Sequence, residues 1–470
     1  MAAPTLTIAT GGLILRVPAG TSGDSVTWND VWDWDDGGGS SGGDGDVPID
    51  GGGTAKVSTF VLEIVKDAVY LVLANKIIWY GDGSTPSYFR SIQEQIYFES
   101  GAYDQVQNAA TKDMIGSCYR YVDPVTSPGM STASSIWNMR ECLIIFKNEV
   151  SNIAFRNAGT WKNVVFQGNS AAAIGSVRID IHNADLVMER ITLSGFGNSL
   201  VMFTSLNTTP EDVKVQYGNY VIQGQGVGIT FLGLKVGDGI TNGIKTWGAT
   251  TTLNLVNPTG NALGTNAISH DGSWIKEQYT FNLHIRDKNF TDLAGAAVDC
   301  EYANLVEGSD GKSYKCIQDH TAIDATHKPI TGSDWGSFWE LFDDEVNPDP
   351  QVGGDWDTEF DYKSGATEFS TQTTDADGNI PEQTIQFKKW VRTSETSEAR
   401  THKITISKAN YETLVEGDIY VNEKMKLYHK LLPALAASDV REDTIFNDDR
   451  TGTLDITHDV ILEDVGVQLR

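Results

Sequence analysis

The sequence predicts an all-β protein whose middle part is a β-solenoid. Three observations support this fold class. A five-residue strand pattern recurs six times, glycine is frequent while proline is scarce (47 against 13), and apolar residues alternate with polar ones over short segments. Frequent glycine with little proline fits many short strands joined by tight turns better than it fits helices.

The repeated unit is a β-branched or aliphatic residue, any residue, a large apolar residue, any residue, and then Asn or Gly. The copies are IAFRN (153–157), VVFQG (164–168), IDIHN (179–183), ITLSG (191–195), ITFLG (229–233) and LNLVN (253–257). Period-two alternation makes each copy a half-buried strand. The closing Asn or Gly suits a bend with positive φ.

Short strands that bend repeatedly in one sense, with Asn or Gly at the corners, build a solenoid. In that fold the first and third residues of each copy share one core. We therefore expect burial of Phe155, Phe166, Ile181, Leu193, Phe231 and Leu255. A sandwich or barrel made of hairpins would bury them too, and only parallel pairing of successive strands distinguishes the solenoid.

The region before the repeats divides into an arm and a spacer over residues 1–54. Residues 37–53 are almost wholly Gly, Ser and Asp, which is the composition of a solvated linker. The acidic residues there have no spacing that matches a calcium-binding loop. Strand-rich sequence begins at about residue 55.

On these residues the chain resembles the right-handed parallel β-helices of phage tailspikes, tail fibres and carbohydrate-active enzymes. The resemblance covers roughly residues 55–265, and the solenoid is taken as residues 55–270. It implies a virion protein that assembles as a homotrimer. Tailspikes of this type that cleave glycans use paired carboxylates, and Asp180, Asp185 and Glu189 are the acidic candidates on the repeats. In a chain with 63 acidic residues such pairs arise by chance, so no catalytic residue is assigned.

The C-terminal third carries three separated motifs. They are TFNLHIRD (280–287) with LAGAAV (293–298), TTDADG (373–378), and HKITISKANY (402–411). This set resembles the Ig-like, transthyretin-like sandwich of phage virion proteins and carboxypeptidase regulatory domains. It implies a sandwich formed by residues 271–300 and 351–430, followed by a C-terminal extension over 431–470. Asn410 stands where Gly is usual, and Asn tolerates the left-handed turn. Asp375 and Asp377 fit an Asx-stabilised hairpin better than a calcium loop.

Residues 301–350 form an insertion within that sandwich. Its GKSYKC segment, His320-Thr321, Pro329 and later tryptophans resemble the small chitin-binding-type modules of chitinases and phage fibres. The resemblance implies a carbohydrate-binding module with Tyr314, Trp335 and Trp339 as ligand-binding residues. Sugar rings stack on exposed aromatic faces, but a module this small also needs aromatic residues for its own core. Both roles stay open, and His320 is expected to satisfy a backbone group rather than a metal.

Charge and composition restrict the partners. The net charge of −28 repels phosphate backbones, so the chain is not expected to bind nucleic acid. No apolar stretch is long enough to insert in a membrane, and the start lacks the pattern of a signal peptide. The four cysteines are too few and too scattered for a disulfide framework. Neither a cofactor nor a metal is expected.

Together these expectations describe a bacteriophage virion structural protein at the virion surface. Its role would be that of a tail fibre, spike or head-surface appendage. Its partners would be other virion proteins and a host cell-surface glycan. Two alternatives stay open: a tailspike-type glycan depolymerase, and a purely structural capsid-decoration or baseplate protein.

Overall fold

The computed structural model describes side chains from residue 111 onward and the backbone of strands β1 to β10 before it. The described ranges are 111–121, 135–146, 153–168, 178–197, 199–247, 250–260, 267–268, 272–308, 310–321, 323–343, 361–390 and 397–434. The chain divides into one unit of residues 1–276 with 390–394, and a second unit of residues 277–389 with 395–470. Among the described residues, helices are confined to α2 (Asp324–His327) and η3 (Trp335–Ser337).

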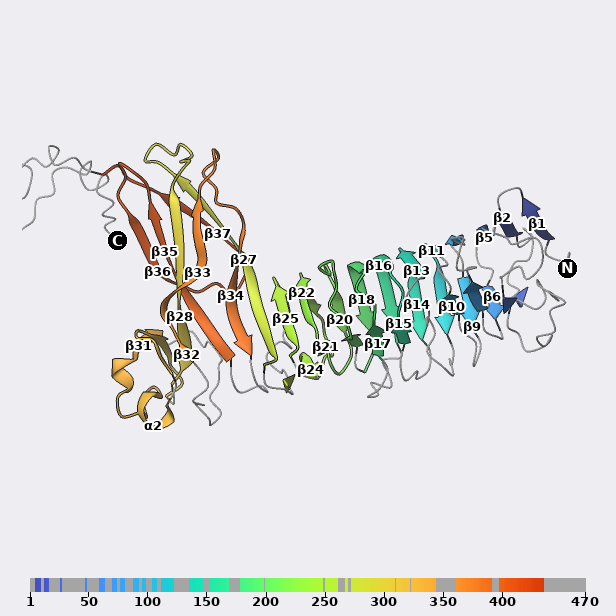
Figure 1. The fold of residues 1–470 in the computed structure, drawn as a ribbon, viewed down its shortest axis with the longest axis horizontal. Coiled ribbons are helices and arrows are strands. Elements are labelled where there is room, and N and C mark those ends of the chain that lie inside the picture. The colour runs from blue at the N-terminus through green and yellow to red at the C-terminus, as the bar shows by residue number, and fades with distance from the viewer. Residues whose placement is uncertain are drawn as a thin grey trace, which may run out of the picture. The chain divides into compact units, whose positions relative to one another are not determined.

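The first unit is a parallel β-solenoid in which the chain passes through three faces in each turn (Figure 1). The first face contains β2 (Gly12–Arg16), β5 (Thr59–Glu63), β8 (Tyr88–Ile92), β11 (Thr111–Ile115), β13 (Ile136–Arg140), the first halves of β16 (Gly159–Gln167) and β18 (Leu186–Ser194), β22 (Gly228–Leu232) and β25 (Thr252–Val256). The strand β1 (Thr5–Ala9) is antiparallel to β2.

The other two faces are built in the same way from parallel strands. The second contains β3 (Val26–Thr27), β6 (Tyr70–Leu73), β9 (Gln95–Phe98), β12 (Cys118–Tyr121), β14 (Leu143–Phe146), the second halves of β16 and β18, β20 (Lys214–Gln216) and β23 (Lys235–Val236). The third contains β4 (Val47–Pro48), β7 (Ile77–Tyr80), β10 (Asp104–Gln107), β15 (Ile153–Phe155), β17 (Arg178–Ile181), β19 (Ser199–Met202), β21 (Ile222–Gln225), β24 (Lys245–Trp247) and β26 (Ala267–Ile268).

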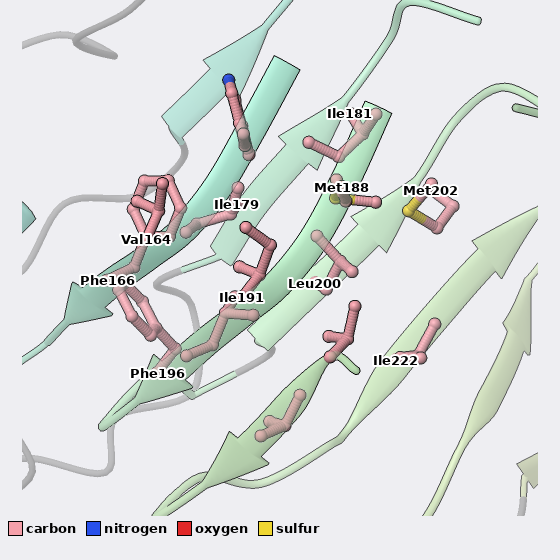
Figure 2. Packing of buried hydrophobic residues seen from close by; sticks show 14 of the residues in the cluster. Val164, Phe166, Ile179, Ile181, Met188, Ile191, Phe196, Leu200, Met202 and Ile222 are labelled. Carbon is pink, nitrogen blue, oxygen red and sulfur yellow. The ribbon is translucent and has the colours of Figure 1, made fainter. Parts of the chain in front are cut away.

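The repeated pentads supply the core of this solenoid, as predicted. Phe155, Phe166, Ile181, Leu193, Phe231 and Leu255 are each at most 3% exposed and belong to one hydrophobic cluster. Figure 2 shows side chains of this cluster meeting between strands. Successive strands pair in parallel, which confirms the solenoid and excludes the hairpin alternative for these repeats.

The irregular spacing of the pentads has a simple structural cause. Ile153 pairs with Ile179 on the third face, whereas Val164 pairs with Ile191 on the second. The first four copies therefore alternate between these two faces, the last two lie on the first face, and the true repeat is one whole turn. Hydrogen-bonded partners in adjacent turns are separated by 22 to 27 residues.

One corner of the solenoid is a column of single residues in the left-handed conformation between the first and second faces. Its members have φ between 52° and 68° and are Gly116, Glu141, Asn163, Arg190, Asp212, Gly233 and Asn257. The backbone N–H of Glu141 donates to the carbonyl of Lys162 in the next turn, and that of Arg190 donates to Glu211. These hydrogen bonds hold non-glycine residues in a conformation that costs about 1–2 kcal/mol each.

The closing residues of the pentads follow the expected positive φ only in part. Gly195, Gly233 and Asn257 have it, but Asn157, Gly168 and Asn183 do not. At Gly168 the reason for glycine is a close approach, since a Cβ would lie 2.4 Å from the Gly195 carbonyl oxygen. Asn183 instead forms an Asx turn, in which its Oδ1 accepts from the Asp185 N–H at 2.9 Å.

The second unit is built on antiparallel pairing around one central strand. That strand, β28 (Ala297–Glu307), pairs with β35 (Ser397–Ser407) on one side and with β33 (Ser364–Thr373) and β29 (Ser313–Cys316) on the other. Further strands are β27 (Trp274–Arg286), β34 (Gln383–Trp390), β36 (Leu414–Ile419), β37 (Met425–Lys430), β30 (His320–Thr321), β31 (Trp339–Asp343) and β32 (Asp361–Tyr362). A core drawn mainly from β27, β28, β34 and β35 lies within this unit.

Two turn predictions are confirmed in this unit. Asp375 Oδ1 accepts from the N–H groups of Asp377 at 3.0 Å and Asn379 at 2.9 Å, which is the expected Asx-stabilised turn. Asn410 has φ 68°, as its place in a left-handed turn requires. Asp287 makes the same kind of turn, since its Oδ1 accepts from the N–H groups of Asn289 and Thr291.

Two predicted segments lie largely or wholly outside the described residues. Of the spacer at 37–53, only β4 is described, and it pairs in parallel with β7. The extension at 431–470 is described only as far as residue 434.

Candidate ligand-binding site

The segment predicted as an insertion leaves and re-enters the second unit at adjacent points. The Asn304 backbone N–H donates to the Lys363 carbonyl at 3.0 Å, and the Lys363 N–H donates to Asn304 Oδ1 at 2.6 Å. Between them the chain forms β29 and β31, which pair antiparallel, and β30 and β32, which also pair antiparallel. The ends of the segment are thus fixed by the edge of β28.

An aromatic cluster fills this segment. Its members are Tyr314, Trp335, Phe338, Trp339, Tyr362, His320 and His327. Tyr314 and Trp339 are only 3% and 2% exposed. The Tyr314 hydroxyl donates to Asp310 Oδ2 at 2.8 Å, and the Trp339 indole N–H donates to the His327 carbonyl at 2.7 Å. These two predicted ligand-binding residues therefore have no free ring face.

Trp335 and Phe338 differ from them because they are only half buried. Trp335 lies on η3, where its ring meets Tyr314 edge to face at 5.6 Å between centroids. Phe338 follows η3 and packs against His327 at 4.1 Å and His320 at 4.6 Å. Of the three residues predicted to bind ligand, only Trp335 keeps part of its ring accessible. Phe338, a further aromatic residue of the segment that is not among those three, joins it.

His320 lies among the rings of the cluster. Its Nδ1 is 2.8 Å from the Gln318 carbonyl oxygen, so Nδ1 carries the proton and donates there. Burial lowers the pKa of His320, and the nearby His327 acts in the same direction, which keeps the ring neutral at pH 7. This is the backbone-satisfying role predicted from the sequence. Cys316 Sγ is 3.8 Å from Nδ1.

A hollow of about 320 Å³ lies beside the cluster, within the second unit. It is lined by residues of β28, β29, β31, β33, β35 and β36 and by neighbouring backbone, including Tyr302, Ile317, Ser364, Gly365, Thr401, His402 and Gly417. Lys315 Nζ lies 2.7 Å from Glu340 and 2.8 Å from Asp418, and Lys403 Nζ lies 3.1 Å from Glu301. Burial acts to lower the pKa of Lys315, but the two carboxylates outweigh it and raise that pKa.

The hollow offers carboxylate oxygens and ammonium groups at short range, which suits a ligand rich in hydroxyl groups. None of Tyr314, Trp335 and Trp339 lines it. Sequence reasoning missed the hollow because its walls come from strands more than one hundred residues apart, as the 103-residue separation of Lys315 and Asp418 illustrates.

Behind the hollow lies a buried charge pair. Glu368 Oε2 is 2.7 Å from Arg400 Nη1, and Glu368 Oε1 accepts from the Gln386 N–H at 2.8 Å. Burial acts to raise the pKa of Glu368, but the His402 ring, Arg400 and the Gln386 N–H outweigh it and lower that pKa to about 2. The Arg400 guanidinium also stacks on Tyr302, which lines the hollow, at 3.6 Å.

The three acidic candidates of the solenoid have separate environments. Glu189, on the first face, pairs with Lys162 at 2.8 Å and with Arg190. Asp185 accepts from the Asn207 side chain at 2.7 Å. Asp180 lies on β17 of the third face, 3% exposed, with its Oδ1 2.9 Å from Arg178 Nε. Glu189 and Asp180 thus belong to different faces.

In the described ranges, no three His, Cys, Asp or Glu side chains gather in a group that could hold a metal ion. None of the helices in that part of the chain has the length and apolarity needed to cross a bilayer.

Comparisons with protein-family models, with curated proteins and with solved structures find no match to this chain.

Proposed function

We propose that the chain is a structural protein of a bacteriophage virion, a tail fibre, spike or head-surface appendage, that attaches to a glycan of the host surface. The observation that carries this proposal is the parallel β-solenoid joined to a second strand-rich unit with a looped-out aromatic segment. A solenoid presents a long, rigid outer surface whose side chains are independent of its core. Such a surface suits attachment better than it suits a metabolic reaction.

In this proposal the second unit is an Ig-like sandwich, and the segment over 301–350 is its inserted carbohydrate-binding module. The pairing of β28 with both β33 and β35 and the Asx turn at Asp375 support the first assignment. The adjacent ends of the looped-out segment at Asn304 and Lys363 support the second. The chain would assemble as a homotrimer with other virion proteins, and sedimentation of the full chain tests the trimer.

The ligand of the module would be a neutral or amino sugar. Trp335 and Phe338 supply half-exposed rings for the apolar face of a pyranose, and the neighbouring hollow supplies charged groups for its hydroxyls. Tyr314 and Trp339 would support these residues from the core instead of contacting the sugar. The surplus of acidic groups in the chain disfavours an anionic polymer at this site.

The test is a binding assay of the full chain on immobilised chitin and on chitin oligosaccharides. Trp335→Ala and Phe338→Ala are expected to weaken binding about tenfold each, since each removes a stacking ring. The matched control is Phe290→Ala, because Phe290 is an aromatic residue of the same unit that is 70% exposed and lies outside the cluster. Equal binding by all three variants would remove the module from the attachment role.

A reducing-end assay on the same glycans addresses the depolymerase alternative. Release of new reducing ends by the purified chain would replace attachment with hydrolysis as the main activity. Immunogold microscopy of virions tests the wider proposal, because labelling of particles is expected and absence of label from every purified particle would contradict it.

A further inference from the structure

Aromatic rings gather on the outer side of the third face of the solenoid. His182, which follows β17, stacks on Phe203, which follows β19, with centroids 4.4 Å apart and planes 8° apart. Trp247 of β24 pairs with Gln225 of β21. The registers of these strands place His182, Phe203, Gln225 and Trp247 in one row along the solenoid. At about 4.8 Å per strand the row is about 14 Å long.

Cationic side chains lie against these rings. The Arg178 guanidinium carbon is 5.7 Å from the Phe203 centroid and 5.5 Å from that of Trp247. Lys245 Nζ is 5.4 Å from the Tyr220 centroid and 5.7 Å from that of Trp247. Trp247 is 37% exposed, so one part of this cation–aromatic surface faces solvent. Within the described part of the chain, Lys245 has no carboxylate partner.

A buried carboxylate holds one of the cations in place. Asp180 lies beneath Arg178, and burial raises its pKa to about 6 while Arg178 opposes that change. Val201, which pairs with Asp180 on the neighbouring strand β19, is fully buried. Arg178 therefore extends across the strands toward Trp247 with its head group already oriented. Burial and the positive charges of Arg156 and Arg178 lower the pKa of His182, so its ring stacks in the neutral form.

Positive charge in this place is unexpected for the chain as a whole, whose net charge is −28. The cation–aromatic contacts of Lys245 are only weakly stabilising at an exposed site, and they leave its ammonium group without a carboxylate among the described residues. Guanidinium and ammonium groups bind carboxylate or phosphate oxygens, while an adjacent ring packs on the C–H face of a sugar. Both requirements are met within neighbouring rows of the same face.

We propose that the surface formed by Arg178, Phe203, Lys245 and Trp247, which spans three neighbouring outward rows of the third face, binds an acidic saccharide, one that carries carboxylate or phosphate groups. This surface belongs to the solenoid, and the proposal stands whether or not the segment over 301–350 binds a sugar. Its ligand also differs in charge from the neutral or amino sugar proposed there.

The experiment measures binding of the intact chain by calorimetry. The probes are short galacturonate oligomers for carboxylate, short phosphorylated glucose oligomers for phosphate, and dextran oligomers as the neutral comparison. Short oligomers limit repulsion by the rest of the acidic protein. Binding of one of the acidic probes and not of dextran is expected, and the acidic probe that binds identifies the source of the charge.

The variants are Lys245→Gln and Trp247→Ala, each expected to weaken binding of the acidic probe about tenfold. Both residues are at the surface and leave the Arg178–Asp180 pair intact, so the variants should fold. The controls are Lys235→Gln, which removes a lysine from β23 on the second face, and Trp274→Ala, which removes another tryptophan that carries a lysine over its ring. The controls are expected to bind as the unchanged chain does.

Several results would overturn the proposal. They are failure of both acidic probes to bind, equal affinity for dextran, and equal loss of affinity in the controls. A change in sedimentation of Trp247→Ala without any effect on saccharide binding would instead assign this surface to contact with a second copy. If the chain still binds chitin but binds neither acidic probe, the saccharide surface on the solenoid is rejected and the proposed attachment through residues 301–350 is not.

Discussion

Replacement of Phe166 by alanine tests the solenoid core directly. Its ring is fully buried, and it meets the rings of Trp161 at 5.3 Å and Phe155 at 6.0 Å between centroids. Truncation of a buried Phe to Ala costs about 3–5 kcal/mol. Each aromatic pair contributes about 0.5–1.5 kcal/mol beyond its buried area. Because two pairs are lost here, we expect Phe166→Ala to lower the free energy of unfolding by about 4 kcal/mol.

The control is Val165→Ala, one residue earlier on the same strand. Val165 is 37% exposed and points away from the core, so its truncation should cost less than about 1 kcal/mol. Urea unfolding followed by circular dichroism gives the stability. Hydrogen exchange of the β16 and β18 amides locates the loss, because a solenoid can open in segments. A cost for Phe166→Ala no greater than that for Val165→Ala would refute the inward orientation of Phe166.

Three further predictions follow from particular residues. Glu141→Gly should leave stability unchanged or raise it by up to about 1 kcal/mol in thermal unfolding, since glycine adopts φ 56° without strain, whereas Glu141→Val should lower it. The folded-state pKa of Glu368 is about 2 against 4.5, so the stability it supplies is present above about pH 4.5 and is lost as the pH falls toward 2. Urea titrations between those pH values should show a flatter dependence for Glu368→Gln. Trp339→Ala should cost about 3–5 kcal/mol in the second unit and Trp335→Ala clearly less, because only Trp339 is fully enclosed, and hydrogen exchange of β29 checks the order.

The buried residues of the solenoid could be predicted because the information is local. Along a strand, side chains alternate between the two sides, so a five-residue pattern suffices to orient Phe166 or Leu255 toward the core. The length of a turn could not be predicted in the same way. The pentads fall on different faces, and the segments between strands vary in length, as the 22- and 27-residue separations between partners in adjacent turns show.

The corner residues show where local reasoning fails. Asn163, Asp212 and Asn257 are recognisable as residues that tolerate positive φ, but Glu141 and Arg190 are not. Their conformation is maintained by hydrogen bonds to the next turn, and those partners are not visible until the register of the turns is known. Sequence alone therefore assigned the bends to the last residue of each pentad, which is correct at Gly195 and not at Asn157.

The candidate sites were harder to predict for a related reason. Tyr314, Trp335 and Trp339 are all aromatic residues of one sequence motif, so the sequence does not show which of them is exposed. Only the packing of the folded segment shows that Tyr314 and Trp339 are enclosed and Trp335 is not. The row containing Phe203 and Trp247 carries no local motif at all. The row can be recognised in the sequence only when the length of a turn is known, because its residues recur at intervals of about one turn.

The alternation of strand residues also separates the function of the solenoid from its stability. On the third face, Ile179, Leu200 and Ile222 enter the core, while the residues next to them lie on the outer side. A change at Lys245 or Trp247 therefore leaves the core contacts in place, unlike a change at Phe166. Loss of saccharide binding in those two variants, with unchanged unfolding, would report on the outer surface itself. The same separation explains why the outer surfaces differ although the core pattern is the same. The first face has an ion pair at Glu189, and the third face has aromatic rings with cations.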